Sequence, residues 1–263
     1  MIFSVINGVD SDACEERVVG SQPAIIVPLT ATTPQTLLQA AQEAEQAGAD
    51  VVEFRADYMI GAHPETTFSA MGRELLRDLF ETIEIPVLFT VRTGPEGGEV
   101  DLSEFRYRVM LATVLDLMMQ EELPADRIGI DLEFHSAATP DLAARAHSLG
   151  FTPVISHHEW GETPDDEVMH VLYDDMLAID NAVVKLAVMA HSPEDTQRLL
   201  EVTRQVAAAS GRPLIGIAMG EAGVRSRVEG WQYGSVATFA AIDKQTAPGQ
   251  LHIAQLRQSL GRV

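Results

Sequence analysis

Eight short apolar segments, most of them rich in valine and isoleucine, restrict the fold of this chain more than any other feature of its sequence. They read as nearly continuous apolar runs rather than strict alternations, which is typical of parallel strands buried on both faces. The segments are AIIVPLT (24–30), VVEFRAD (51–57), VLFTVR (87–92), IGIDLEF (128–134), TPVISHHE (152–159), AVVKLAVM (182–189), PLIGIAMG (213–220) and GSVATF (234–239).

Amphipathic helical patterns lie between these segments, at 33–48, 103–122, 139–150 and 192–211 among others. Several open with Ser or Thr followed by Pro, the order preferred at a helix N-terminus. Eight strand–helix units in about 240 residues predict an α/β fold of the (β/α)8 TIM-barrel type. A doubly wound dinucleotide-binding sheet is less well supported, because no GxGxxG follows the first strand.

The domain organisation is expected to be simple. No linker, low-complexity tract or further repeat interrupts the strand–helix alternation, so residues 1–263 are predicted to form a single barrel domain that carries the catalytic site. Residues 1–20 precede the first predicted strand and are candidates for a short hairpin that closes the bottom of the barrel.

Charge and composition exclude several classes of partner. The 263 residues carry a net charge of −21, which disfavours nucleic acids and anionic membranes, because binding to both depends on a basic surface. No apolar run approaches the roughly 20 residues that span a bilayer, and the N-terminus lacks a signal-peptide pattern. The single cysteine, Cys14, excludes an internal disulfide. We therefore expect a cytoplasmic protein.

Polar side chains gather at the carboxyl ends of most predicted strands, where barrel enzymes form their active sites. Any one of them would usually be half of a structural ion pair, but unrelated pairs would not concentrate at these ends. The candidates are Glu53, Arg55 and Asp57 on one strand face, Arg92, Glu96, Asp131, Glu133, Ser156, His157, His158, Glu159, Lys185, Met219, Arg225, Arg227, Thr246 and Gln250. The adjacent His157 and His158 point to opposite faces, so at most one is expected in the barrel mouth.

Lys185 lies in the middle of the apolar run AVVKLAVMA, where an unpaired ammonium is costly. Burial and neighbouring arginines both favour a neutral amine, which can form a Schiff base with a ketone or aldehyde. His158 is suited to proton transfer near neutral pH, and Arg227 indicates a carboxylate or phosphate on the substrate. These residues predict an imine-forming lyase or aldolase.

A metal site is the competing interpretation, because Glu53, Asp131, Glu133 and His158 are all possible ligands. The cations Arg55, Arg92, Lys185 and Arg227 are predicted to enter the same cavity and to balance these acids. We therefore expect no metal and no other cofactor apart from the covalent imine on Lys185.

Seven elements occur together in the order and spacing typical of one known family: VVEFRAD, LFTVRTGPEGGE, DLE, SHHE, VKLAVM, MGEAGVRSRV and GSVATFAAIDKQTAPGQ. Over residues 24–251 the chain resembles the type I 3-dehydroquinate dehydratases, the Schiff-base class of this shikimate-pathway enzyme. The resemblance implies a barrel fold and loss of water from 3-dehydroquinate by syn elimination, giving 3-dehydroshikimate. It also implies a homodimer.

The resemblance implies a role for each matching position. Lys185 matches the imine-forming lysine, His158 the general acid and base, and Glu96 the acid that supports the histidine and the leaving group. Residues that match substrate-binding positions are Glu53, Arg55 and Arg92 for the ring hydroxyls, Arg227 and Gln250 for the carboxylate, Thr246 in the last loop, and Met219 as a possible contact. Asp131 and Glu133 match a D-x-E that supports the surroundings of His158 and Lys185.

Two positions depart from the family pattern: His157 stands where Asn is common, and Thr246 where Ser is usual. Two alternatives stay open. One is a class I aldolase of the same barrel type, and the other is a barrel that binds a cyclic polyol carboxylate without catalysis. The sequence does not distinguish aromatic biosynthesis from quinate breakdown.

Overall fold

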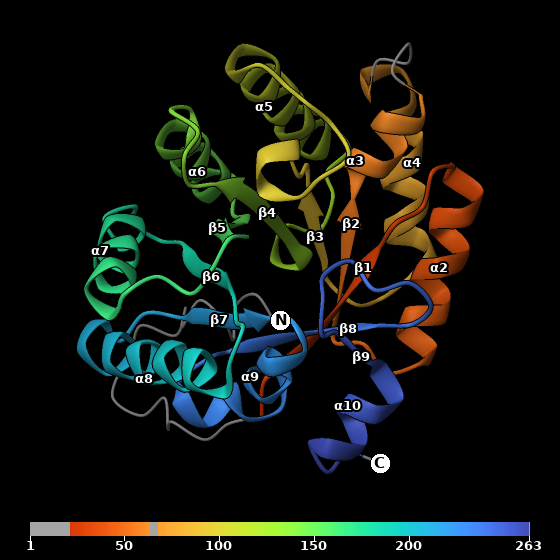
Figure 1. Ribbon diagram of the computed structural model, residues 1–263. Helices are drawn as coiled ribbons and strands as arrows, with labels where there is room; N and C mark the ends of the chain where they lie inside the picture. Colours follow the sequence, from red (N-terminus) through yellow and green to blue (C-terminus); the bar gives the residue numbers. More distant parts are fainter. Residues whose placement is uncertain (1–21, 64–67, 263) are drawn as a thin grey trace.

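A curved parallel β-sheet lies at the centre of the molecule, with α-helices along its outer side (Figure 1). The computed structural model describes residues 22–63 and 68–262, so the hairpin expected within residues 1–20 lies outside the described residues. The strands are β1 (Ala24–Leu29), β2 (Val51–Arg55), β3 (Val87–Thr90), β4 (Ile128–Glu133), β5 (Thr152–Glu159), β6 (Val183–Met189), β7 (Leu214–Met219), β8 (Ala237–Ala241) and β9 (Leu251–His252).

The strand order in the described part of the chain is β7-β6-β5-β4-β3-β2-β1-β8-β9, and the paired neighbours run parallel. At the open side, one isolated parallel bridge joins Leu214 of β7 to Ser235, and the Val236 N–H donates to the Leu214 carbonyl at 2.8 Å. The predicted α/β class with a parallel sheet is confirmed, and its curled shape is consistent with a TIM-like barrel.

Helices connect successive strands and cover the outer side of the sheet (Figure 1). They are α2 (Pro34–Gln46), α3 (Ala56–Ala62), α4 (Phe68–Thr82), α5 (Glu104–Gln120), α6 (Thr139–Ser148), α7 (Asp166–Leu177), α8 (Pro193–Ser210), α9 (Val224–Glu229) and α10 (Ile253–Ser259). Short 3-10 turns are η1 (Gly94–Glu96), η2 (Ala125–Arg127), η3 (Glu221–Gly223) and η4 (Gly230–Tyr233). Within the described ranges, no helix combines the length and the apolar character that crossing a bilayer requires.

The predicted helix starts are explained by capping. The Thr33 and Ser192 side chains accept hydrogen bonds from backbone N–H groups in the first turns of α2 and α8, and each is followed by proline. Helix α8 ends at Ser210 and is capped by Gly211, whose φ of 63° is adopted most readily by glycine.

Two predicted strands differ from the structure at their ends. The prediction that Asp57 continues the strand face of Glu53 and Arg55 is wrong, because β2 ends at Arg55 and α3 begins at Ala56. The last strand, expected at 234–239, begins only at Ala237. Gly234 has a φ of 91°, which is incompatible with an extended strand, so the chain is still turning at this point.

The sheet separates two apolar cores. Side chains on its outer side pack against the helices, whereas a smaller group on the inner side includes Val183, Ala187 and Phe239. Because successive residues of a strand point to opposite faces, Lys185 lies on the inner side between Val183 and Ala187. The strand alternation of β6 therefore places the lysine inside the curved sheet.

Candidate active site

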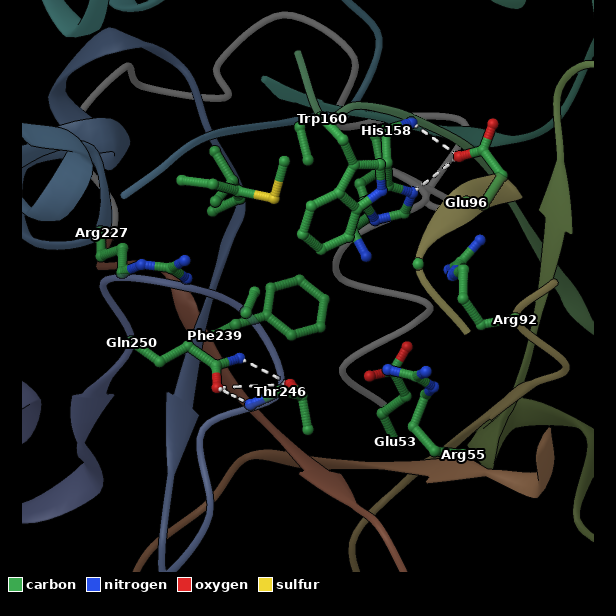
Figure 2. Close-up of a pocket in the computed structure, with 16 residues that line it drawn as sticks. Glu53, Arg55, Arg92, Glu96, His158, Trp160, Arg227, Phe239, Thr246 and Gln250 are labelled. Atoms are coloured by element: carbon green, nitrogen blue, oxygen red, sulfur yellow. Dashed lines mark hydrogen bonds and ion pairs between the residues drawn. The ribbon is translucent and has the colours of Figure 1, made fainter. Parts of the chain in front are cut away.

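A pocket opens at the carboxyl ends of the strands, on the inner side of the sheet (Figure 2). It brings together all ten residues that the sequence assigns to catalysis or substrate binding. The lining consists of Glu53, Arg55, Arg92, Glu96, Gly97, His158, Trp160, Lys185, Ala187, Ile217, Met219, Arg227, Phe239, Thr246, Ala247 and Gln250. Asp131 and Glu133 lie outside this lining and contact it through Arg92.

Lys185 is the buried amine of the pocket, with 5% of its surface exposed. Its Nζ lies 4.3 Å from the centroid of the Phe239 ring, and within 22–63 and 68–262 it makes no hydrogen bond or ion pair. Burial lowers the pKa of Lys185, and Arg92 and Arg55 lower it further, against the opposing effect of Glu53 and Asp131. The site therefore favours the neutral, nucleophilic form of the amine.

His158 faces the same pocket and is held by Glu96 (Figure 2). The His158 Nδ1 lies 3.0 Å from Glu96 Oε2, and the same oxygen accepts the His158 backbone N–H at 2.7 Å. Burial, together with Arg92 and Lys185, lowers the pKa of His158 to about 3 even though Glu96 acts in the opposite direction. The imidazole is therefore neutral near pH 7, with Nδ1 directed at the carboxylate and Nε2 available to accept a proton.

The Glu96 carboxylate is shared with the second histidine. Its Oε1 lies 3.2 Å from His157 Nδ1, and His157 does not line the pocket. Burial favours the neutral acid, but hydrogen bonds to His157 and His158 dominate and hold the pKa of Glu96 far below its ordinary value. Glu96 is thus an ionised anchor between two imidazoles.

Arg92 organises the acids beneath the pocket. Its guanidinium lies 2.8 Å from Asp131 Oδ1 and donates to Ser156 Oγ at 2.9 Å, while Glu133 Oε1 is 3.4 Å away. Burial alone would raise the pKa of Asp131, but Arg92 and Lys185 bring it below its ordinary value. Glu133 also accepts hydrogen bonds from the backbone and side chain of Thr93, each at 2.8 Å, which anchors the loop after β3.

Glu53 and Arg55 enter the pocket from the end of β2. Glu53 Oε1 accepts a hydrogen bond from Thr90 Oγ1 at 2.9 Å. Arg55 makes two hydrogen bonds of 2.8 Å with Asp57, which also accepts the backbone N–H of Arg92 at 3.3 Å. Asp57 therefore positions Arg55 and the β3 loop rather than lining the pocket.

Arg227, Thr246 and Gln250 form the opposite wall (Figure 2). Arg227 is 1% exposed, and the only hydrogen bond of its side chain to the described residues runs from the guanidinium to the Pro248 carbonyl at 3.2 Å. Burial lowers the pKa of Arg227 to about 10, and no acid within 22–63 and 68–262 offsets that effect. Gln250 Oε1 accepts the Thr246 N–H at 2.7 Å, and its Nε2 donates to Thr246 Oγ1 at 2.9 Å. This wall presents positive charge without a partner carboxylate, as an anion site requires.

Sequence reasoning missed the apolar part of the lining. Trp160 lies over His158 with ring centroids 6.4 Å apart and planes at 21°, and Phe239 lies beside Lys185. Ala187, Ile217 and Ala247 complete this surface. Two of these residues could have been found from the sequence. Ala187 lies two residues after Lys185 and Ile217 two residues before Met219, so strand alternation places each on the inner face of the sheet.

A second group of possible metal ligands among the described residues shares Glu96 with the pocket and consists of Glu96, His135 and His157. It differs from the set considered from the sequence. The four ligands considered from the sequence have other partners. Asp131 and Glu133 form ion pairs with Arg92, Glu53 accepts a hydrogen bond from Thr90, and His158 is hydrogen-bonded to Glu96.

A buried amine and a neutral imidazole facing one polar pocket at the carboxyl edge of a parallel sheet define the chain as an α/β enzyme. Residues 25–262 match the family model described as type I 3-dehydroquinase, and the chain belongs to that family. It is 32% identical over 241 residues to the catabolic 3-dehydroquinate dehydratase of Acinetobacter baylyi, covering 90% of this chain and 85% of the relative.

Two further similarities cover nearly the whole chain. A 3-dehydroquinate dehydratase of Klebsiella pneumoniae is 33% identical over 235 residues, covering 89% of this chain and 90% of that protein. The crystal structure of 3-dehydroquinate dehydratase from Geobacillus kaustophilus superposes with a TM-score of 0.81 at 28% identity, covering 92% and 91% of the two chains.

Proposed function

We propose that this chain is a 3-dehydroquinate dehydratase that removes water from 3-dehydroquinate through an imine on Lys185, without a metal or another cofactor. The observation that carries the proposal is the pairing, in one pocket, of a buried amine favoured in its neutral form with a carboxylate-held neutral imidazole. Family membership supports the same reaction, a step of the shikimate pathway.

The first stage is imine formation. The Lys185 Nζ attacks the C3 ketone of the substrate, and the resulting carbinolamine takes up one proton from solvent and loses the ketone oxygen as water to give a protonated imine. That cation withdraws electrons from C2 and acidifies its C–H bond. The burial of the amine supports this step, because desolvation favours a neutral nucleophile before attack.

His158 then carries the proton. Its neutral ring takes the C2 proton, and the electron pair enters the imine as an enamine. The protonated ring next donates to the C1 hydroxyl, which leaves as water while the C1–C2 double bond forms. Hydrolysis of the imine returns Lys185 and releases 3-dehydroshikimate. Glu96 supports both states of His158, because it accepts from Nδ1 and stabilises the imidazolium.

The substrate is held at its polar edge. Arg227 is proposed to pair with the carboxylate, with Gln250 and Thr246 beside it, since no acid in the described part of the chain pairs with the guanidinium. Glu53, Arg55 and Arg92 are proposed to bind the ring hydroxyls from the other wall, and Met219 to contact the ring. Asp131 and Glu133 act indirectly by holding Arg92.

The same proposal includes the assembly. A closed (β/α)8 barrel in one domain is supported by the Leu214–Ser235 bridge and by family matches that span 25–262. A homodimer is proposed from the family resemblance alone, and a cytoplasmic location from the composition of the sequence. Light scattering of the purified protein tests the dimer.

Turnover of 3-dehydroquinate, followed by the ultraviolet absorbance of the conjugated enone product, tests the activity. Wild type and Lys244→Met are expected to form product, whereas Lys185→Met is not. Lys244 is the control because it is the chain's only other lysine and is exposed. Aldol cleavage without dehydration would support the aldolase alternative. Tight binding without product would support the non-catalytic one.

A further inference from the structure

Beside the pocket, Glu96 faces two histidines that the proposed chemistry does not use. His157 Nδ1 lies 3.2 Å from Glu96 Oε1, and the rings of His135 and His157 meet edge to face with centroids 4.5 Å apart. One ligand atom from each of the three residues lies within 4.8 Å of the other two. His135 follows the end of β4 and is exposed, whereas Glu96 and His157 are buried.

Two imidazoles and a carboxylate are ligands typical of zinc and related borderline cations. Bonds of about 2.0–2.1 Å in a tetrahedral zinc site place ligand atoms about 3.4 Å apart. The distances between the three ligand atoms are now 4.8 Å or less, so each would have to shorten by at most about 1.4 Å. The exposed His135 can supply this movement by side-chain rotation, while Glu96 and His157 already face each other.

We propose that Glu96, His135 and His157 form an inhibitory site for a divalent cation of the zinc class. The strongly acidic surface of the chain raises the local concentration of cations. His135 provides the exposed entry, and water would fill the fourth ligand position.

Inhibition follows from the shared carboxylate. Glu96 directs Oε1 to His157 and Oε2 to the ring and backbone of His158. A cation bound at Oε1 withdraws electron density from the carboxylate and draws it away from His158, so the catalytic imidazole is less well oriented and its imidazolium less stabilised. This consequence rests on the proposed function, whereas cation binding itself does not.

Isothermal titration of the purified, chelator-treated protein with ZnCl2 tests binding. Wild type and the control His147→Ala are expected to bind one zinc ion with the same affinity, because His147 is exposed and lies on α6 away from the cluster. His135→Ala should bind at least about 10-fold more weakly. MgCl2 should bind weakly to all three, since Mg²⁺ prefers oxygen ligands. Equal zinc affinity in all three proteins would overturn the site.

Turnover measured with and without ZnCl2 tests the consequence. Zinc should lower kcat of the wild type with little change in KM, EDTA should restore it, and His135→Ala should need at least about 10-fold more zinc for the same loss. Zinc sensitivity that is equal in wild type and His135→Ala would overturn the inhibitory role. If the chelated protein does not turn over 3-dehydroquinate, the proposed function fails, and the calorimetric comparison still decides the site.

Discussion

Glu96 holds His158 at two points with a single carboxylate oxygen: Oε2 lies 3.0 Å from the ring Nδ1 and 2.7 Å from the backbone nitrogen. This double contact fixes the ring and the strand that carries it, so Nε2 of His158 is the nitrogen presented to the pocket. His157 shares only the other oxygen of Glu96 and lies behind it.

Replacing His157 and replacing His158 are therefore expected to have very different effects on kcat. His158→Ala should lower kcat by about 10²- to 10⁴-fold, the range for loss of a general acid–base. His157→Ala should lower kcat by no more than about 10-fold, because Glu96 keeps both contacts with His158. Steady-state kinetics in EDTA-containing buffer checks the ranking. The opposite order would assign the catalytic proton transfer to His157.

Lys185 should leave a pH signature in stability. Burial lowers the pKa of its amine below the 10.5 of an unperturbed lysine. Between the lowered pKa of the folded chain and 10.5, the unfolded chain therefore binds more protons than the folded chain, so the unfolding free energy rises with pH in that window. Lys185→Met abolishes this pH dependence. The unfolding free energy of Lys185→Met minus that of wild type should therefore fall as the pH rises toward 10.5.

Denaturant unfolding at several pH values from about 7 to about 10 measures that difference. Lys244→Met is the matched control, since it makes the same replacement at an exposed lysine. A Lys185→Met difference from wild type that stays constant with pH would mean that the pKa of the Lys185 amine is not lowered.

Arg227 and Arg92 are both buried, but their surroundings predict opposite effects on stability. Arg227 lacks an acidic partner among the described residues, so Arg227→Met should raise the unfolding free energy by on the order of 1–3 kcal/mol. Arg92→Met should lower it by about 3–5 kcal/mol, because it leaves Asp131 and Glu133 without their counter-charge.

The same substitution at Arg227 should weaken binding of the substrate. Loss of a charge-assisted contact to the carboxylate predicts a KM about 10- to 100-fold higher. Chemical denaturation and steady-state kinetics check the two effects together. A destabilised Arg227→Met with an unchanged KM would show that Arg227 is structural.

Gly249 is expected to position the wall that carries Gln250. Its φ is 77°, and a Cβ there would lie 2.2 Å from the Gly220 carbonyl oxygen. Gly249→Ala should therefore displace the loop and lower kcat/KM by about 10- to 100-fold, as misplacement of a substrate-binding group does. Gly211→Ala is the control, because Gly211 also has a positive φ of 63° but meets nothing within 4 Å. It should cost about 1–2 kcal/mol of stability and leave kcat/KM unchanged. Equal kinetic losses in both variants would contradict the specific role of Gly249.

Much of the fold could be predicted because buried parallel strands leave long apolar runs, and capping residues mark where helices begin. The end of β2 before Asp57 could not be predicted from the local sequence. A charged residue after Arg55 fits a strand face as well as the first turn of a helix, and only the tertiary contacts of Asp57 with Arg55 and Arg92 decide the matter. The late start of β8 similarly depends on the backbone at Gly234.

The polar residues of the site could be predicted because each is an exception within an apolar run or belongs to a recognisable motif. Its apolar surface could not, since Trp160 and Phe239 resemble ordinary core residues in sequence. The meeting of His135 with His157 joins the ends of β4 and β5, and no local pattern records such a contact.

Borohydride trapping in the presence of 3-dehydroquinate tests the central claim, an imine on Lys185, most directly. Reduction makes the bond permanent and blocks trypsin, so modified Lys185 should appear in an uncut peptide spanning 146–198, whereas modified Lys244 would give 228–257. We predict an adduct on 146–198, inactivation that parallels its formation, and no adduct in Lys185→Met. An adduct on 228–257, or full turnover after borohydride treatment with substrate present, would contradict the account.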